Sequence, residues 1–278
     1  MPIAAAGTIT VTPTDNANTL INALLGSGSG ITIVGTPTYT APSGASGTFT
    51  GGSGAGIGVN SGVILTSGSA TGAAGPNNSD SFSVENGAPG DSDLSAAAGV
   101  DTHDAAVLQF QFTSATGDLF FNYVFGSEEY NEYVGEFNDA FGFYLNGNNI
   151  ALIPGTNQPV TINNVNCGNP YNPPSGGSHC NLFNNNDLDD GGPFYDIQYD
   201  GFTDVFTAHA SSLGSGVNTI KLAIADAGDD ALDSGVFLQG FSSVEPPPPT
   251  GVPEPPELAF MMIGLVAAAL LGRRRRGR

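Results

Sequence analysis

The feature that most constrains the fold of this chain is an alternation of apolar and polar residues with a period of two. Apolar residues alternate with glutamines over 108–112, and a second alternating run spans 119–125 after the turn Thr116-Gly117-Asp118. Successive side chains of a strand point to opposite faces, so this pattern indicates half-buried β-strands. The same pattern predicts further strands at 8–12, 31–39, 63–66, 141–145, 150–152, 220–224 and 236–241. Many short strands joined by Gly, Asn and Pro turns favour an antiparallel sandwich.

One segment has the period of a helix. Asn16–Leu25 places four apolar residues on one side, with Asp15 as the expected N-cap and Gly26 as the stop. The glycine-rich stretch Gly44–Gly62 lacks the spelling of a phosphate-binding loop and is expected to form turns between strands. We therefore predict an all-β domain at 8–244, a single jelly-roll-like antiparallel β-sandwich with one short N-terminal helix.

The charge distribution excludes some partners. All 26 acidic residues precede the apolar C-terminal run, and Lys221 is the one basic residue before Arg273. A field of this sign repels nucleic acid and attracts divalent cations. We expect no nucleic-acid partner.

Carboxylates crowd the ends of several predicted strands. Such groups repel one another unless they are protonated, solvated or bridged by a cation, and calcium binds roughly six to eight oxygens from carboxylates, amides and carbonyls. The candidate calcium ligands are Glu128, Glu129, Asp139, Asp226 and Asp233. None of the clusters has the spacing of an EF-hand. The alternative is that these acids are solvated and cap loop turns.

Paired carboxylates also raise the alternative of a secreted polysaccharide hydrolase that uses Glu128, Glu129 and Asp139. The chain has no tryptophan to form a sugar platform, and its three histidines are isolated. The sequence shows no GxSxG nucleophile elbow. We therefore expect a protein that is not an enzyme.

Two cysteines, Cys167 and Cys180, lie in a loop rich in Asn, Pro and Gly. In an oxidising compartment a pair this close in sequence predicts one disulfide. The alternative is a metal pair completed by His179.

The C-terminus carries three consecutive signals. A Pro-rich linker at 245–257 contains the motif Val252, Pro253, Glu254 and Pro255. An apolar run follows at Leu258–Gly272, about 22 Å long as a helix and shorter than the ~30 Å core of a bilayer. The positive charges Arg273, Arg274, Arg275 and Arg276 come next and oppose translocation.

These three signals resemble the PEP-CTERM sorting signal of Gram-negative bacteria. The resemblance implies a hydrophobic helix and Arg-rich tail at 258–278 that holds the chain transiently in the inner membrane. It implies processing by an exosortase. The alternative is a plain tail anchor. Residues 1–7 look like the small-residue end of a signal peptide, against the alternative of a leaderless chain with an Ala-rich start.

The segment Asn122–Tyr144 contains FGSEEY and, about ten residues on, NDAFGF. Together with Tyr199–Thr203 and Lys221–Gln239, it resembles the choice-of-anchor L domain, a bacterial surface β domain found with different C-terminal anchors. The resemblance covers nearly all of Thr8–Ser243, and the loop Cys167–Cys180 departs from it as a local insertion. It implies an exported structural or adhesive protein of the cell surface or extracellular matrix, with exopolysaccharide or neighbouring surface proteins as partners.

Overall fold

The computed structural model describes residues 7–26, 28–171 and 174–246, and these form two β-sheets with three short α-helices. The eight-stranded sheet contains β1 (Thr10–Pro13), β3 (Ser46–Thr50), β4 (Ser61–Thr66), β6 (Leu119–Ser127), β10 (Phe183–Asn185), β11 (Gly201–Thr203), β12 (Phe206–Ala210) and β14 (Ser234–Ser242). The six-stranded sheet contains β2 (Ile31–Thr40), β5 (Thr102–Ser114), β7 (Ala140–Leu145), β8 (Asn148–Asn149), β9 (Val160–Thr161) and β13 (Asn218–Ala227). The helices are α1 (Ala17–Leu24), α2 (Gly52–Ala55) and α3 (Ser92–Ala98), with 3₁₀ turns η1 (Ile162–Asn164) and η2 (Cys180–Leu182).

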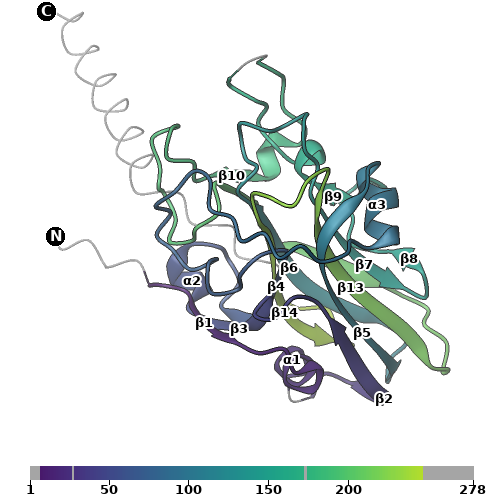
Figure 1. The fold of residues 1–278 in the computed structure, drawn as a ribbon. Coiled ribbons are helices and arrows are strands. Elements are labelled where there is room, and N and C mark those ends of the chain that lie inside the picture. The colour runs from purple at the N-terminus through teal and green to yellow at the C-terminus, as the bar shows by residue number, and fades with distance from the viewer. Residues whose placement is uncertain (1–6, 27, 172–173, 247–278) are drawn as a thin grey trace, which may run out of the picture.

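The two sheets are antiparallel throughout. The first has the order β1-β3-β4-β14-β6-β11-β10, with β12 also paired to β6, and the second has the order β2-β5-β13-β7-β8, with β9 also paired to β7. The centre of each sheet joins strands distant in sequence, β14 with β6 and β13 with β5. Figure 1 shows β5, β13 and β7 side by side, with α3 beyond them.

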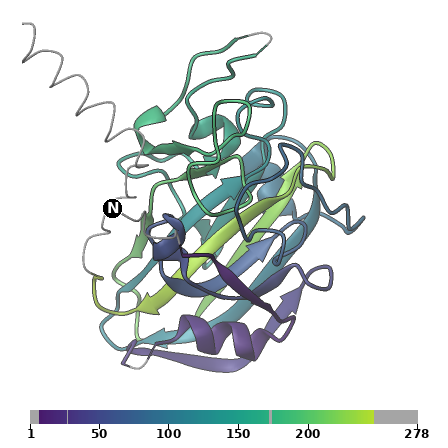
Figure 2. The same cartoon turned by 90° about the vertical axis from the view of Figure 1, so that its left-hand side faces the viewer.

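The main hydrophobic core lies between the sheets. The alternating residues Phe121, Tyr123 and Phe125 of β6 face Phe141 and Phe143 of β7. The rings of Phe121 and Phe143 stack with their centroids 4.2 Å apart. The lower end of this core, as drawn in Figure 2, is closed by α1, whose buried leucines and isoleucine join the same cluster. The prediction of an all-β antiparallel sandwich is confirmed.

A second core lies on the outer face of the eight-stranded sheet. It contains Phe49, Ile64, Phe237 and Tyr199, and the segment from α2 to β4 covers part of it through Ile57. This sheet is therefore buried on both faces, which is why all nine residues of β6 are buried. Strict alternation of apolar and polar residues underestimates the burial of such a strand.

Two local predictions were wrong at the N-terminal helix and in the glycine-rich stretch. The N-cap of α1 is Asn16, whose side chain accepts from the backbone N–H of Thr19, while Asp15 accepts hydrogen bonds from the loop at 43–44. The stretch Gly44–Gly62 contains strand β3 and helix α2 besides turns. Glycine permits the close packing there, since a Cβ on Gly47 would lie 2.7 Å from the backbone oxygen of Thr12.

The helix α3 was not predicted from the sequence. Asp91 caps it by accepting hydrogen bonds from the backbone N–H groups of Asp93 and Leu94. Leu94 is its one buried residue, so the segment carries no stripe of apolar residues at helical spacing. In the β7–β8 hairpin, β8 covers only Asn148–Asn149. There the side-chain oxygen of Asn149, in place of a backbone carbonyl, accepts a hydrogen bond from the backbone N–H of Phe143.

The predicted sorting motif at 252–255, the apolar run and the arginines at 273–276 lie outside the described residues, as do residues 1–6. Within the described ranges, no helix has the length and apolar character needed to span a membrane.

Candidate metal centre

The predicted calcium ligands all lie at one end of the sandwich. Strand pairing brings Ser234 of β14 opposite Ser127 of β6, and Ala225 of β13 opposite Ala140 of β7. The residues that leave or enter these strands therefore meet at the end that carries β9 and β10, at the top of Figure 1. Each of the five predicted ligands, Glu128, Glu129, Asp139, Asp226 and Asp233, is at most 1 % exposed.

Three of the five form a group at the end of the main core, which we call the inner acid group: Glu129, Asp139 and Asp226. Asp139 accepts hydrogen bonds from Ser234 Oγ at 2.7 Å and from Ala227 N at 2.8 Å. Asp226 lies beside Asp139, and a register shift in β13 between Ile224 and Asp226 precedes it. Both carboxylate oxygens of Asp226, and both of Glu129, accept no hydrogen bond from any described residue.

Burial dominates the electrostatics of the inner acid group. Loss of hydration raises the pKa of Asp139 to about 7, against the hydrogen bonds from Ser234 and Ala227, which lower it. Burial and then the charge of Asp139 raise the pKa of Glu129 to about 10 and that of Asp226 well above its ordinary value. The group is therefore a place where negative charge is costly and a proton or a cation is favoured.

Glu128 belongs to a different environment from its neighbour Glu129. Its closest acidic partner is Asp200, on the segment that leads into β11, and together we call them the outer acid group. Asp200 accepts a hydrogen bond from Asn77 Nδ2 at 2.5 Å through one oxygen. The other oxygen of Asp200 and both oxygens of Glu128 have no hydrogen-bond donor among the described residues.

Asp233 differs from the other four because its carboxylate oxygens accept hydrogen bonds from the backbone alone. Both of its carboxylate oxygens lie 3.1 Å from the N–H of Val84, which donates to them. Asp104 acts similarly toward the backbone N–H groups of Asn86, Gly87 and Ala88. These two buried aspartates therefore hold the segment 84–88 against the sandwich.

The described part of the chain offers no free lysine or arginine to neutralise these acids, and His103 lies opposite Asp226 where β5 pairs with β13. Lys221 is its one lysine or arginine, and its ammonium group lies 2.7 Å from Asp91 and 2.5 Å from Asp93. The same nitrogen lies 4.9 Å from the ring centroid of Tyr144. Lys221 therefore forms ion pairs with Asp91, the N-cap of α3, and with Asp93 in its first turn.

The carboxylates at this end of the sandwich do not by themselves form a metal site among the described residues. No three Asp, Glu, His or Cys side chains in the described residues are grouped around one point as metal ligands. Calcium also accepts hydroxyl, amide and backbone carbonyl oxygens. Ser67 and Ser234 place such groups beside Asp226 and Asp139.

The sequence did not identify Asp200 as part of this end of the molecule. It is a single acid inside the run Tyr199–Thr203, and its proximity to Glu128 depends on the pairing of β11 with β6. In the sequence, the one signal that included Asp200 was the resemblance of the run Tyr199–Thr203 to a known family.

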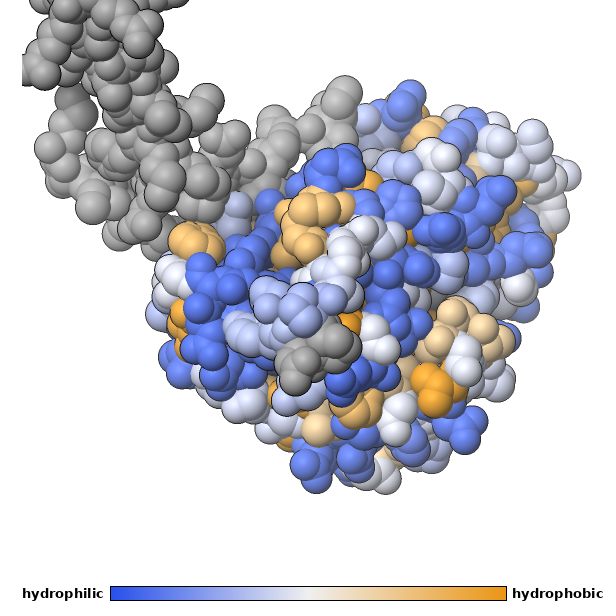
Figure 3. Space-filling model, turned by 90° about the horizontal axis from the view of Figure 1, so that it is seen from above, coloured by the Kyte–Doolittle hydropathy of each residue, from blue (hydrophilic) through white to orange (hydrophobic). Residues whose placement is uncertain are grey.

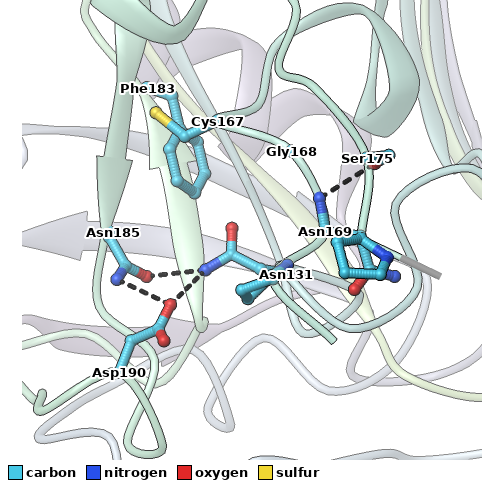
Figure 4. Close-up of a pocket in the computed structure, with 10 residues that line it drawn as sticks. Asn131, Cys167, Gly168, Asn169, Ser175, Phe183, Asn185 and Asp190 are labelled. Carbon is cyan, nitrogen blue, oxygen red and sulfur yellow. Dashed lines mark hydrogen bonds between the residues drawn. The ribbon is translucent and has the colours of Figure 1, made fainter. Parts of the chain in front are cut away.

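The cysteines lie on the same end of the molecule. Cys167 and Cys180 are joined by a disulfide with their Cα atoms 4.4 Å apart, and the ring of His179 contacts the carbonyl of Asn164 instead of the sulfurs. The loop forms one wall of an open pocket of about 280 Å³. Figure 4 shows Asn131 between this wall and Asp190, with its amide nitrogen directed to Asn185 and Asp190.

The fold is an antiparallel β-sandwich with buried acids gathered at one end. The chain belongs to the choice-of-anchor L domain family, which it matches over residues 9–244. This is not an enzyme family, and membership implies an exported protein associated with the cell surface. No curated protein and no solved structure matches the chain.

Proposed function

We propose that this protein is a structural or adhesive component of the cell surface or extracellular matrix, stiffened by calcium bound at the inner acid group. The observation that supports the proposal is the burial of Glu129 and Asp226 beside Asp139 without hydrogen-bond donors for either. Buried charges in proteins are normally paired or bound to metal.

The energetics favour a divalent cation as the partner. Two unit charges 4 Å apart interact by roughly 4 kcal/mol at an effective dielectric constant of 20. A doubly charged ion between Asp139 and Asp226 converts this repulsion into attraction and replaces part of the lost hydration. Calcium suits the site better than magnesium because it tolerates irregular sets of about six to eight oxygens, whereas magnesium requires near-octahedral geometry.

The location of the site gives the ion a mechanical role. The inner acid group joins the exits of β6 and β13 to the entry of β7 and the start of β14, two strands from each sheet. An ion there would tie both sheets together at the end opposite α1. Such a domain resists deformation without any catalytic step.

The surface suits a protein exposed to water or to a polysaccharide matrix. Figure 3 shows a face that is mostly hydrophilic, with hydrophobic residues scattered in small groups. We propose delivery by the PEP-CTERM route, with the exosortase acting near 252–255, and contacts with exopolysaccharide or neighbouring surface proteins outside the cell. Burial of Glu128, Glu129 and Asp139 disfavours the hydrolase alternative, because a sugar chain cannot reach carboxylates that are 0 % exposed.

The test is the melting temperature of the full chain, purified in mild detergent, with EDTA or with calcium. We expect calcium to raise it by several degrees, since an ion at about 100 times its Kd stabilises by about 2.7 kcal/mol. Magnesium should raise it less. Sodium chloride at matched ionic strength measures simple screening, and a shift that this salt reproduces in full would refute the proposal.

The variant Asp226→Asn sharpens the test because it removes charge while keeping shape. We expect it to raise the melting temperature in EDTA, where the buried charge is a cost, and to remove most of the calcium increment. Asp101→Asn is the matched control: this exposed acid lies near the same end of β13, where its backbone carbonyl accepts from Gly228 N. It should leave both values unchanged.

A further inference from the structure

The open pocket of Figure 4 contains a hydrogen-bond acceptor that no described residue satisfies. Asn131 is 3 % exposed, and its Oδ1 has no hydrogen-bond donor among the described residues. Its Nδ2 donates to Asn185 Oδ1 at 3.1 Å and to Asp190 Oδ2 at 2.9 Å. These bonds fix the orientation of the amide, because a rotated amide would place its oxygen against two acceptors. Figure 4 shows Oδ1 directed away from Asn185 and Asp190, on the side of Gly168.

The other polar groups of the pocket are suited to hydroxyl groups. Asn131 and Asn185 both donate to the same oxygen of Asp190, Oδ2, and among the described residues Oδ1 of Asp190 receives no hydrogen bond. Ser175 Oγ accepts from Asn169 N at 3.0 Å, so its own hydrogen is available to donate. Two acceptors and one donor match a ligand with neighbouring hydroxyl groups, since each hydroxyl both donates and accepts.

The remaining walls of the pocket are apolar. They are formed by the ring of Phe183, by two prolines and by the disulfide-bonded Cys167. The ring of Phe183 is held by that of Tyr130, with their centroids 4.7 Å apart. The pocket volume of about 280 Å³ lies just below the range of about 300–1,000 Å³ that is usual for drug-sized ligands. The space therefore fits one small ring with an apolar face and a hydroxylated edge, which is the form of a sugar residue.

The charge of the pocket disfavours other ligands. Asp190 is the one charged side chain among the described residues that line it, and it opposes phosphate and other anions. A cation is not required, because two amides already donate to this carboxylate. An apolar peptide side chain would fill the ring space but would leave Asn131 Oδ1 without a donor, which is costly for a buried acceptor.

We propose that this pocket binds one neutral sugar residue of a polysaccharide. Asn131 Oδ1 and Asp190 Oδ1 accept from neighbouring hydroxyls, Ser175 donates to a sugar oxygen, and the apolar face of the ring lies against Phe183. The sugar enters from the rim, where Ser175 and Asp190 are exposed. The proposal names the contact behind the adhesive role in the proposed function and rests on that role, but it requires no calcium.

The experiment measures sugar binding by saturation-transfer difference NMR. The full chain, in a detergent that has no sugar headgroup, is titrated with the methyl glycosides of glucose, galactose, mannose and N-acetylglucosamine. We expect at least one of these to bind with a Kd of about 1 mM, as is usual for so few atoms. Methyl glucuronide, which is an anion, should bind more weakly than methyl glucoside.

Two variants and a matched control locate the site. Asp190→Ala should weaken binding by at least about tenfold, because it removes a charged acceptor, and Ser175→Ala by about fivefold. Both residues are exposed, so neither change disturbs the core. Asp189→Ala is the control. It removes the same charge from the neighbouring exposed residue, which does not line the pocket, and it should keep the wild-type affinity.

The outcomes separate this proposal from the calcium proposal. A wild-type chain that binds none of the four neutral glycosides overturns the pocket, as does an affinity that Asp190→Ala and Ser175→Ala leave unchanged. Equal weakening by Asp189→Ala and Asp190→Ala also overturns it, because the effect is then one of general charge. The titration is repeated in EDTA. Sugar binding without a calcium-dependent melting temperature refutes the calcium site alone, and the reverse result refutes the sugar pocket alone.

Discussion

Raising the pH of the calcium-free protein should destabilise it, and calcium should abolish that effect. In the folded protein burial raises the pKa of Asp139 to about 7 from an ordinary value of 3.8. The folded state therefore holds a proton that the unfolded state has released. Stability is highest near pH 4 and falls as the pH rises through 7. It continues to fall at higher pH because burial also raises the pKa of Asp200 to about 8 and that of Glu129 to about 10.

The size of the effect follows from the shift. A difference of roughly three pKa units for Asp139 is worth about 4 kcal/mol, at 1.36 kcal/mol per unit. Asp200, whose pKa burial raises to about 8, adds a loss of the same sign. Because stable domains unfold at a cost of only about 5–15 kcal/mol, such a loss changes the denaturation midpoint strongly.

The assay is urea denaturation of the full chain at pH 5, 6, 7 and 8 in a calcium chelator, repeated in saturating calcium. Linear extrapolation gives the free energy of unfolding at each pH. We expect a steep decline with pH in chelator and a shallow one in calcium, because the ion replaces the proton. Matched sodium chloride corrects for general repulsion among surface acids. A free energy that stays flat or rises with pH in chelator would refute the reasoning.

Three further predictions concern other parts of the chain. Asp233→Ala should destabilise the protein by about 1–3 kcal/mol with or without calcium, since it removes hydrogen bonds to backbone N–H groups; a loss seen only in calcium would make Asp233 a ligand. Exported protein should show Cys167 and Cys180 in one crosslinked peptide and no free thiol, and replacing both by serine should cost about 3 kcal/mol in urea while the core aromatics keep their near-UV signal. Mature protein from the native host should end before Leu258, and an intact mass that includes Arg278 on most chains would remove the sorting interpretation.

The strands of the main core could be predicted because apolar and polar residues alternate along them. The run 108–112 has this form and lies within β5, and 220–224 lies within β13. The outer core was invisible in the sequence, because Ile64 and Phe237 are covered by loops that no periodic pattern describes. The small helix α3 was missed for a related reason. Hydrogen bonds at its cap stabilise it, and it has no stripe of apolar residues that the sequence pattern would show.

The acids were identified individually, but their grouping was not. The adjacent pair Glu128 and Glu129 suggested a single site, whereas the chain turns at the end of β6 and gives the two residues different partners. Asp233 had the sequence context of a ligand, and the structure instead directs backbone N–H groups at it. Asp200 lies 72 residues after Glu128, and Val84 lies 149 residues before Asp233. Local sequence patterns do not encode contacts over such separations.

The measurement that tests the central claim most directly is a calorimetric titration of calcium into the metal-free chain near pH 7, carried out in two buffers with different heats of ionisation. Carboxyls with a raised pKa hold protons at this pH, so their replacement by an ion must release protons. We predict saturable binding whose observed heat depends on the buffer in proportion to the protons released. Binding that fails to saturate, or heats that are identical in the two buffers, would contradict the claim that calcium occupies the buried acids.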